Sequence, residues 1–157
     1  MKILLLAIGK TDEKYLETGI RKYMDRIVHY VPFEMKLLPD LKNRKNLGFE
    51  QQKQAEGEWL LAELQPGDGL VLLDENGKQF TSREFSSLLD RKITNGPKRL
   101  VFVIGGPYGF SQAVYQRAQD SISLSAMTFS HQMVRLIFLE QLYRAFSILR
   151  GEPYHHD

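Results

Sequence analysis

An apolar run followed by a glycine-rich loop, in residues 100–109, constrains the fold of this chain most. The run reads LVFVI, which is short and β-branched enough for a buried strand. The loop reads GGPYG, and its glycines allow the backbone to come close to a ligand. A second short strand is predicted at residues 121–124, and it leads into the small-residue segment 125–129. Two such loops at strand ends predict a ligand crevice at the carboxyl edge of a sheet.

Strand and helix patterns alternate along the whole chain. Short apolar or alternating runs predict strands, and they lie at residues 2–8, 33–37, 70–73, 100–104 and 121–124. Apolar residues at helical spacing predict helices, and they lie at about residues 13–29, 48–64, 81–95 and 131–149. The order predicted is βαβαβαβαβα, in which the helix between the last two strands has no range of its own. This order predicts an α/β fold with a mostly parallel sheet flanked by helices, in a single domain over residues 1–157.

Three local signals refine this arrangement. Residues 33–37 alternate between apolar and charged side chains, which predicts a strand at the edge of the sheet. Residues 74–77 read DENG, a turn signal that predicts the end of the preceding strand at Leu73. Thr81 is followed three residues later by Glu84, which predicts a capping box at the start of a helix.

The last helix, residues 131–149, is apolar around nearly its whole circumference. Its polar positions form one narrow stripe of Glu140, Arg144 and Ser147, and the first two are spaced to form an ion pair. A helix of this kind must be buried on more than one side. In a small chain the sheet can cover one side and a second subunit the other, so the sequence predicts an obligate homodimer.

Composition excludes several classes of function. The chain has no cysteine, which excludes disulfides and cysteine-ligated zinc, and its four histidines lack the spacing of metal ligands. No apolar run approaches the ~18 residues of a membrane span. The first apolar segment lacks the cleavage site of a signal peptide. We therefore expect a cytoplasmic protein that binds neither a membrane nor a metal.

The crevice does not match the common nucleotide-binding or nucleophile motifs. A dinucleotide fingerprint requires glycine where this chain has Ile104, and the phosphate-binding loop is absent from the sequence. Ser125 and Ser130 lie near His131 in the sequence, but turns and helix caps explain these serines better than an activated nucleophile does. A crevice of glycine, small and apolar residues suits a cofactor that carries its own reactivity.

Three segments together resemble the ribosomal RNA large-subunit methyltransferase H family, the small single-domain branch of the SPOUT methyltransferases. They are IGGPYG at residues 104–109, LSAMTF at residues 124–129 with His131, and Glu140-x-x-Tyr143-Arg144-Ala145 with the tail Pro153-Tyr154-His155. The resemblance covers the whole chain. It implies a C-terminal deep trefoil knot, S-adenosyl-L-methionine as the cofactor, and a homodimer. It also implies methylation of N3 of a pseudouridine in 23S ribosomal RNA of the assembled ribosome.

The resemblance further implies roles for individual residues. Those expected to contact the cofactor are Leu73, Gly105, Gly106, Leu124, Ser125, Ala126, Met127, Thr128 and Phe129. The expected catalytic residues are Arg144 as a cation beside the carbonyls of the target base, His155 as the candidate base, and Tyr154 beside it.

Alternatives stay open for the residues and for the function. The alternative for Gly106 is a turn glycine with positive φ, that for Arg144 is a residue that only pairs with Glu140, and that for His155 is a frayed terminal residue. Basic residues expected to contact RNA phosphates are Lys42, Arg44, Lys45, Arg91 and Lys92. The other functions are a non-catalytic RNA-binding or ribosome-assembly module, and a SPOUT methyltransferase that acts on tRNA.

Overall fold

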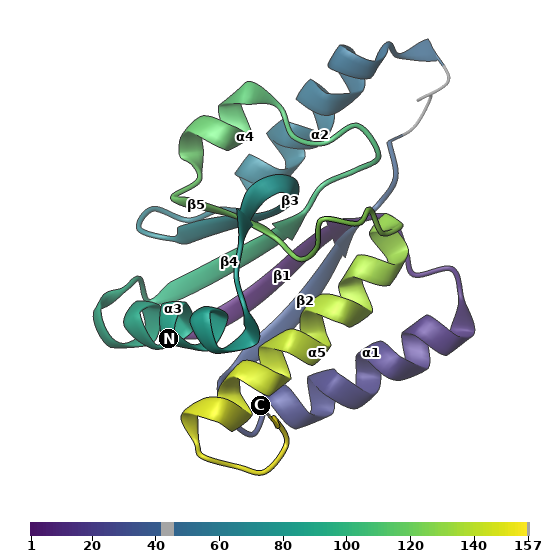
Figure 1. Cartoon of the computed structure of the whole chain (residues 1–157). Coiled ribbons are helices and arrows are strands. Elements are labelled where there is room, and N and C mark those ends of the chain that lie inside the picture. The colour runs from purple at the N-terminus through teal and green to yellow at the C-terminus, as the bar shows by residue number, and fades with distance from the viewer. Residues whose placement is uncertain (42–45, 157) are drawn as a thin grey trace.

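A sheet of five parallel strands forms the centre of the molecule across residues 1–41 and 46–156, which the computed structural model describes (Figure 1). The strands are β1 (Lys2–Ile8), β2 (Phe33–Leu38), β3 (Gly69–Gln79), β4 (Arg99–Ile104) and β5 (Asp120–Ser123). Their order across the sheet is β2-β1-β4-β3-β5, and each neighbouring pair is parallel. All carboxyl ends therefore meet at one edge of the sheet.

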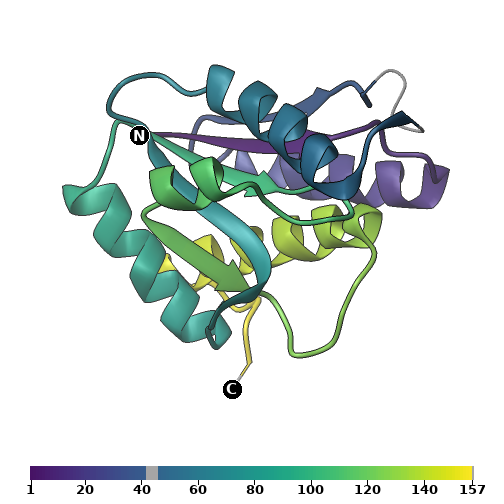
Figure 2. The ribbon, with the colours of Figure 1, turned by 90° about the horizontal axis from the view of Figure 1, so that it is seen from above.

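Helices cover both faces of this sheet (Figures 1 and 2). On one face lie α1 (Lys14–Ile27), α3 (Ser82–Asn95) and α5 (His131–Leu149), and on the other lie α2 (Phe49–Ala62) and α4 (Gln112–Arg117). The short α4 belongs to the predicted alternation, although apolar spacing alone does not locate it. The predicted α/β fold with a parallel sheet is confirmed, whereas the trefoil knot stays a prediction. In the part of the chain described, no helix is long and apolar enough to cross a membrane.

Two of the local signals are confirmed. The strand β2 lies at an edge of the sheet, beside β1 only. At the start of α3, Thr81 Oγ1 accepts a hydrogen bond from the Glu84 backbone N–H at 3.1 Å, and Glu84 Oε2 accepts one from the Thr81 N–H at 2.7 Å. This reciprocal capping box satisfies two of the N–H groups that a helix start leaves unpaired.

The prediction that the third strand ends at Leu73 is wrong, because β3 continues to Gln79. Leu73 and Lys78 are both register partners of Ile122 on β5, so residues 74–77 form a bulge between them. Gly77 permits this bulge, since a Cβ there would lie 2.6 Å from the backbone nitrogen of Ile122. The DENG segment therefore bends β3 without ending it.

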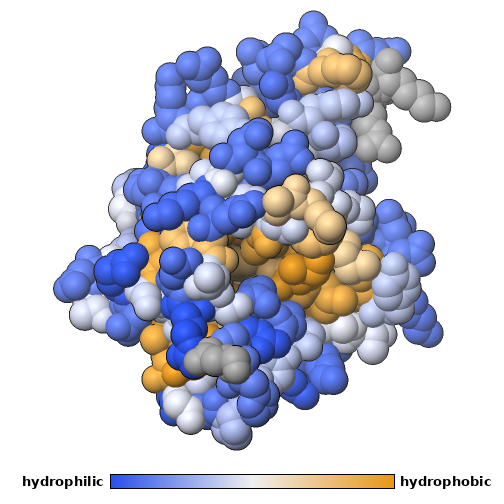
Figure 3. Space-filling model, in the orientation of Figure 1, coloured by the Kyte–Doolittle hydropathy of each residue, from blue (hydrophilic) through white to orange (hydrophobic). Residues whose placement is uncertain are grey.

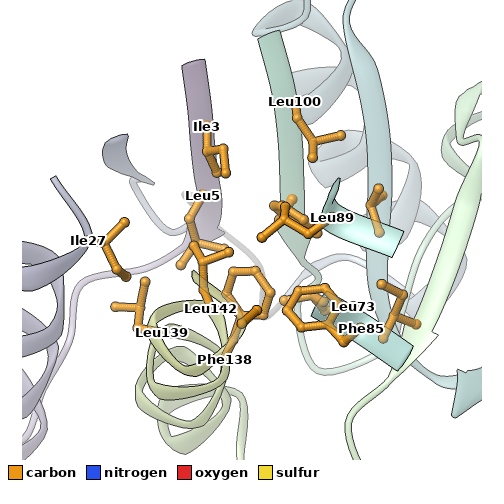
Figure 4. Close-up of a cluster of buried hydrophobic side chains, with 14 of the residues drawn as sticks. Ile3, Leu5, Ile27, Leu73, Phe85, Leu89, Leu100, Phe138, Leu139 and Leu142 are labelled. Atoms are coloured by element: carbon orange, nitrogen blue, oxygen red, sulfur yellow. The ribbon is translucent and has the colours of Figure 1, made fainter. Parts of the chain in front are cut away.

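Apolar side chains from α1, α3 and α5 pack against one face of the sheet and form the larger core (Figure 4). Phe138 of α5 is fully buried, and its ring centroid lies 4.8 Å from that of Phe102 and 6.3 Å from that of Phe85. Full burial of such a side chain contributes ~2–3 kcal/mol to stability. This packing holds α5 on the sheet between α1 and α3.

Most of α5 is covered by its own chain, which differs from the sequence prediction. α1 and α3 flank it, and α1 comes so close that a Cβ at Gly19 would lie 2.9 Å from Leu136 Cδ1. Ser147, expected in the polar stripe, is fully buried and donates a hydrogen bond to the Arg144 carbonyl at 2.7 Å. A partly exposed outer strip remains, consisting of Met133, Ile137, Glu140, Gln141, Arg144 and Ile148. The homodimer that the sequence predicts would have only this strip of α5 left to cover, and it stays a prediction.

Arg135 joins the start of α5 to the end of β1, although its side chain is fully buried. Its Nη2 donates to the Ile8 carbonyl at 2.8 Å, and its Nη1 donates to Thr11 Oγ1 at 3.0 Å. Desolvation lowers the pKa of this guanidinium below its ordinary value. The two hydrogen bonds fix the point at which α5 begins, beside the carboxyl edge of the sheet.

A buried ion pair closes the opposite, amino edge. Asp68, only 6% exposed, accepts hydrogen bonds from Arg99 Nε at 3.0 Å and from the Gln65 backbone N–H at 2.7 Å. Burial by itself raises the pKa of the Asp68 carboxyl, but the hydrogen bonds from Arg99 and Gln65 outweigh it, so the pKa lies below its ordinary value of 3.8. This pair ties the loop before β3 to the start of β4.

We expect Asp68→Ala to lower the free energy of unfolding by ~3 kcal/mol, because it leaves the Arg99 charge buried without its partner. The pKa of Asp68 is lower in the folded protein than in the unfolded chain. The stability that Asp68 contributes is therefore fully present above its pKa in the unfolded chain, and it is lost as the pH falls through its pKa in the folded protein. Urea denaturation from about pH 6 to about pH 3 should show the stability of wild type and Asp68→Asn converging at the acid end. A difference that does not change with pH would contradict this assignment.

Candidate active site

The main pocket lies at the carboxyl edge of the sheet, where β3, β4 and β5 end and α5 begins. Its volume is about 350 Å³, which is within the range of small-molecule sites. The glycine loop, residues 105–109, forms one wall, and the segment of residues 124–130 forms another. The structure thus brings together the two small-residue loops that the sequence places at neighbouring strand ends.

All but one of the residues assigned to the cofactor line this pocket. Those that line it are Leu73, Gly105, Gly106, Leu124, Ser125, Met127, Thr128 and Phe129. Ala126 lies in the same segment but does not line the pocket. Leu73 is only 7% exposed, so it belongs to the core as well as to the pocket wall.

Close packing against α2 and Phe110 shapes the glycine loop. A Cβ at Gly106 would lie 2.2 Å from Glu56 Oε2, and a Cβ at Gly105 would lie 3.0 Å from a ring carbon of Phe110. The positive φ considered for Gly106 belongs instead to Gly109, at +82°. Gly106 is therefore required for the close approach of a buried carboxylate and not for a turn conformation.

Hydrogen bonds from serines hold the second wall. Ser123 Oγ donates to the Ser125 carbonyl at 2.9 Å, and Ser125 Oγ accepts from the Met127 N–H at 2.9 Å. Ser130 caps α5, because its Oγ accepts from the Met133 N–H at 3.2 Å. The serines are thus turn and cap residues, as the sequence favours, and the Met127 side chain is left 77% exposed.

The bulge in β3 gives the pocket an acidic side that the sequence analysis did not assign to it. Among the described residues that line the pocket, Asp74 and Glu75 are acidic and none is Lys or Arg. Asp74 Oδ2 accepts a hydrogen bond from the Tyr115 hydroxyl at 2.5 Å, and burial together with this bond raises the pKa of Tyr115. Glu75 Oε2 accepts from Thr128 Oγ1 at 3.4 Å. A pocket of this charge favours a ligand with positive charge.

A second cluster, centred on Glu140, occupies the other half of α5. Glu140 Oε1 accepts hydrogen bonds from Arg144 Nη2 at 2.5 Å and from the Tyr154 hydroxyl at 3.0 Å. The Tyr154 hydroxyl also lies 3.4 Å from that of Tyr23 on α1. The predicted pairing of Arg144 with Glu140 is confirmed. The contacts of Tyr154 with Glu140 on α5 and Tyr23 on α1 anchor the C-terminal tail.

The cluster also defines the protonation of its members. Burial raises the pKa of the Tyr154 hydroxyl, with hydrogen bonds to Tyr23 and Glu140 adding to the effect, so Tyr154 is a hydrogen-bond donor. Arg144 Nη1 lies 3.2 Å from His155 Nδ1, and because a guanidinium can only donate, Nδ1 accepts. A neutral His155 ring therefore carries its proton on Nε2. His155 is held in place by this bond and is not a frayed terminal residue.

The two clusters do not meet within one chain. Arg144, Tyr154 and His155 do not line the pocket, whereas Val134 of α5 does. Arg144 follows Val134 by ten residues on α5, a distance of about 15 Å along the helix axis. The residues expected to hold the cofactor and those expected to act on the base are thus separated.

The basic residues expected to contact RNA have different surroundings. Lys92 Nζ pairs with Asp120 Oδ2 at 2.5 Å, so its charge is largely satisfied within the chain, whereas Arg91 is exposed. Lys42, Arg44 and Lys45 lie outside the described residues. The described part of the chain contains no group of three or more His, Cys, Asp or Glu residues able to hold a metal ion.

The family resemblance implies S-adenosylmethionine as the ligand of this pocket. We expect Gly106→Ala to weaken its binding at least about tenfold, because the added Cβ forces the loop away from Glu56. The matched control is Gly48→Ala, whose Cβ would meet nothing within 4 Å. Calorimetry on Gly106→Ala, Glu56→Ala and the double variant forms a cycle in which Glu56→Ala should relieve part of the Gly106→Ala effect. Strictly additive losses would contradict the steric explanation.

Comparison with known proteins places the chain in a family. A family model described as "Predicted SPOUT methyltransferase" matches residues 1–155. A protein of Parabacteroides distasonis named ribosomal RNA large subunit methyltransferase H is 62% identical over 157 residues, the whole of both chains. Proteins of the same name from Christiangramia forsetii and Bacteroides fragilis are 61% and 55% identical, over 99% and 100% of each chain. The chain therefore belongs to the ribosomal RNA large subunit methyltransferase H family of SPOUT methyltransferases.

Proposed function

We propose that this chain methylates N3 of a pseudouridine in 23S ribosomal RNA of the assembled ribosome, with S-adenosylmethionine as the methyl donor. One observation carries the proposal: the two loops that the family resemblance assigns to the cofactor form one pocket at the carboxyl edge of the sheet. The names of its relatives, which share more than half of its residues over their full length, support ribosomal RNA as the substrate.

The residues present fit this cofactor in charge, and the pocket volume of about 350 Å³ is that of a small-molecule site. When bound, S-adenosylmethionine supplies a methyl group activated by a positively charged sulfonium. With its ammonium and carboxylate groups its net charge is positive, which suits a pocket with Asp74 and Glu75 and without Lys or Arg among the described lining residues. The glycine loop through Gly105 and Gly106, and the second wall through Leu124, Ser125, Met127, Thr128 and Phe129, would hold it by backbone groups and apolar contact.

The second cluster, here called the tail cluster, consists of Glu140, Arg144, Tyr154 and His155. It supplies groups suited to the target base. An N3–H between two carbonyls is weakly acidic, and a cation beside those carbonyls stabilises the negative charge that develops when the proton leaves. Arg144 is that cation, oriented by Glu140. Tyr154 donates its hydroxyl proton to Glu140, so it can donate to a carbonyl oxygen of the base only when that bond opens. His155 accepts from Arg144 through Nδ1, so it can take the N3 proton at that atom only when this bond opens.

We further propose that the enzyme is a homodimer in which the tail of one protomer completes the pocket of the other. Within one chain the two clusters are separated along α5, so a second copy must bring them together for reaction. The outer strip of α5 carries Met133, Ile137 and Ile148, and Figure 3 shows apolar surface over the face that carries α5 and the segment before it. A symmetric contact through this face would bury the strip and create two equivalent sites.

The test of the function is transfer of a radiolabelled methyl group to assembled ribosomes, free ribosomal RNA and tRNA. We expect label in 23S ribosomal RNA of ribosomes and none in tRNA. Label in tRNA alone would favour the tRNA methyltransferase, and failure to bind S-adenosylmethionine in calorimetry would favour the non-catalytic module.

We expect the double variant Asp74→Asn/Glu75→Gln to bind S-adenosylmethionine roughly tenfold more weakly, because two negative charges are removed from the lining of a pocket that holds a cation. The demethylated product, S-adenosylhomocysteine, lacks the sulfonium charge, so its affinity should change less. Calorimetric titration with both ligands measures the ratio, and Glu58→Gln on the exposed side of α2 is the control. Equal weakening of both ligands would show that the carboxylates do not distinguish the charge.

Mixed dimers test the shared site. We expect homodimers of Gly106→Val, defective in the pocket, and of Arg144→Ala/His155→Ala, defective in the tail, to lose methyl transfer. A mixed dimer of the two, purified through different tags, should recover roughly half of the wild-type rate, because one of its two sites is intact. No recovery would place both clusters in the same protomer, and a monomer in sedimentation at micromolar concentration would contradict the dimer itself.

A further inference from the structure

Two aromatic rings stack on each other beside the pocket and remain open to water. Phe49 begins α2, and Tyr108 lies in the glycine loop; their ring centroids are 4.2 Å apart, with an angle of 27° between the planes. Phe49 is 66% exposed and Tyr108 is 42% exposed. Tyr108 stands between Pro107 and Gly109, which both line the pocket. This aromatic pair therefore borders the wall of the pocket that the glycine loop forms.

The core does not explain the exposure of these rings. Large apolar side chains are normally buried, and an exposed group of them indicates an interaction site. The area of two rings is far below the ~800 Å² per partner of a standard protein interface. It is instead comparable to the face of a single nucleobase.

We propose that the aromatic pair stacks an unpaired base of the substrate RNA, next to the nucleotide that is methylated. This inference rests on the proposed function and adds the residues that receive the RNA. A base must leave its stack before its N3 can reach a pocket, and its neighbour then loses a stacking partner. Proteins that bind unstacked RNA bases place them on aromatic side chains, because every base has a π face.

The position of the pair in the fold agrees with this role. Phe49 and Glu56 are seven residues apart, about two turns on the same side of α2, and both contact the glycine loop. Glu56 of this helix packs against the glycine loop at Gly106. Phe49 of the same helix adds an exposed ring beside Tyr108 of the loop. A base stacked on the aromatic pair would therefore lie at a fixed distance from the pocket.

The experiment compares leucine variants, which keep apolar volume and lose the π face, with variants that keep a ring. We expect Phe49→Leu and Tyr108→Leu to lower kcat/KM for ribosomes about 5- to 100-fold, the range found when one stacked base is lost. Phe49→Tyr and Tyr108→Phe should rescue most of that loss. Trp59→Leu, at a partly exposed aromatic ring elsewhere on α2, should stay within about twofold of wild type, since only stacked rings carry this contribution.

Three further measurements distinguish a lost stacking contact from damage to the pocket, the dimer or the fold. The affinity for S-adenosylmethionine, the sedimentation coefficient and the unfolding midpoint of each variant should match those of wild type. Leucine variants that methylate ribosomes at the wild-type rate would overturn the proposal. A loss of cofactor affinity as large as the loss of kcat/KM would also overturn it, because the rings would then act by shaping the glycine loop. Loss of the dimer in these variants would overturn it as well, because the two rings would then contact the second protomer and not RNA. A wild-type enzyme without activity on ribosomes would overturn the proposed function and the stacking role with it.

Discussion

The burial of α5 between α1, α3 and the sheet is the packing on which both clusters depend. Phe138 fixes the middle of the helix in the aromatic core, and Arg135 fixes its start through the Ile8 carbonyl and Thr11. The helix is therefore a rigid spacer. Its first turn contributes to the pocket wall, and its second half carries Glu140 and the anchored tail. A rigid spacer keeps these functions apart within a chain, which makes a second protomer a requirement of the proposed chemistry.

The helix α2 has a comparable role for the glycine loop. A glycine is needed at position 106 because the buried Glu56 carboxylate occupies the space of a side chain. Close packing of this kind leaves a loop few alternative conformations, so the pocket wall is shaped before any ligand arrives. The same helix carries Phe49 beside Tyr108, and it thereby connects the shape of the pocket with the surface around it.

The two clusters differ in electrostatic character, because the described lining of the pocket has carboxylates without Lys or Arg, whereas the tail cluster holds an Arg144–Glu140 ion pair. The pocket contains Asp74 and Glu75, and the tail cluster presents Arg144, whose pKa the hydrogen bond to Glu140 raises further. Acidic groups suit a cationic donor, whereas a fixed cation suits an acceptor that becomes negative as it loses a proton. Their separation lets each act on a different reactant.

Sequence patterns alone determined most of the local elements and most of the pocket wall. Apolar runs located the strands, Thr81 and Glu84 located a helix start, and the small residues after two strands identified the loops. Local signals succeed here because capping, β-branching and glycine act over a few neighbouring residues. The bulge of residues 74–77 was missed because the turn signal DENG is overruled by pairing with β5, which is distant in sequence.

Other features were decided only by tertiary structure. The close approach of Glu56 to Gly106 and the burial of Ser147 depend on which helix meets which surface. The separation of the tail from the pocket depends on the direction in which α5 leaves the sheet edge. Contacts between residues far apart in the chain leave no periodic pattern in the sequence, because each arises from the packing of whole elements and not from the preference of any one residue.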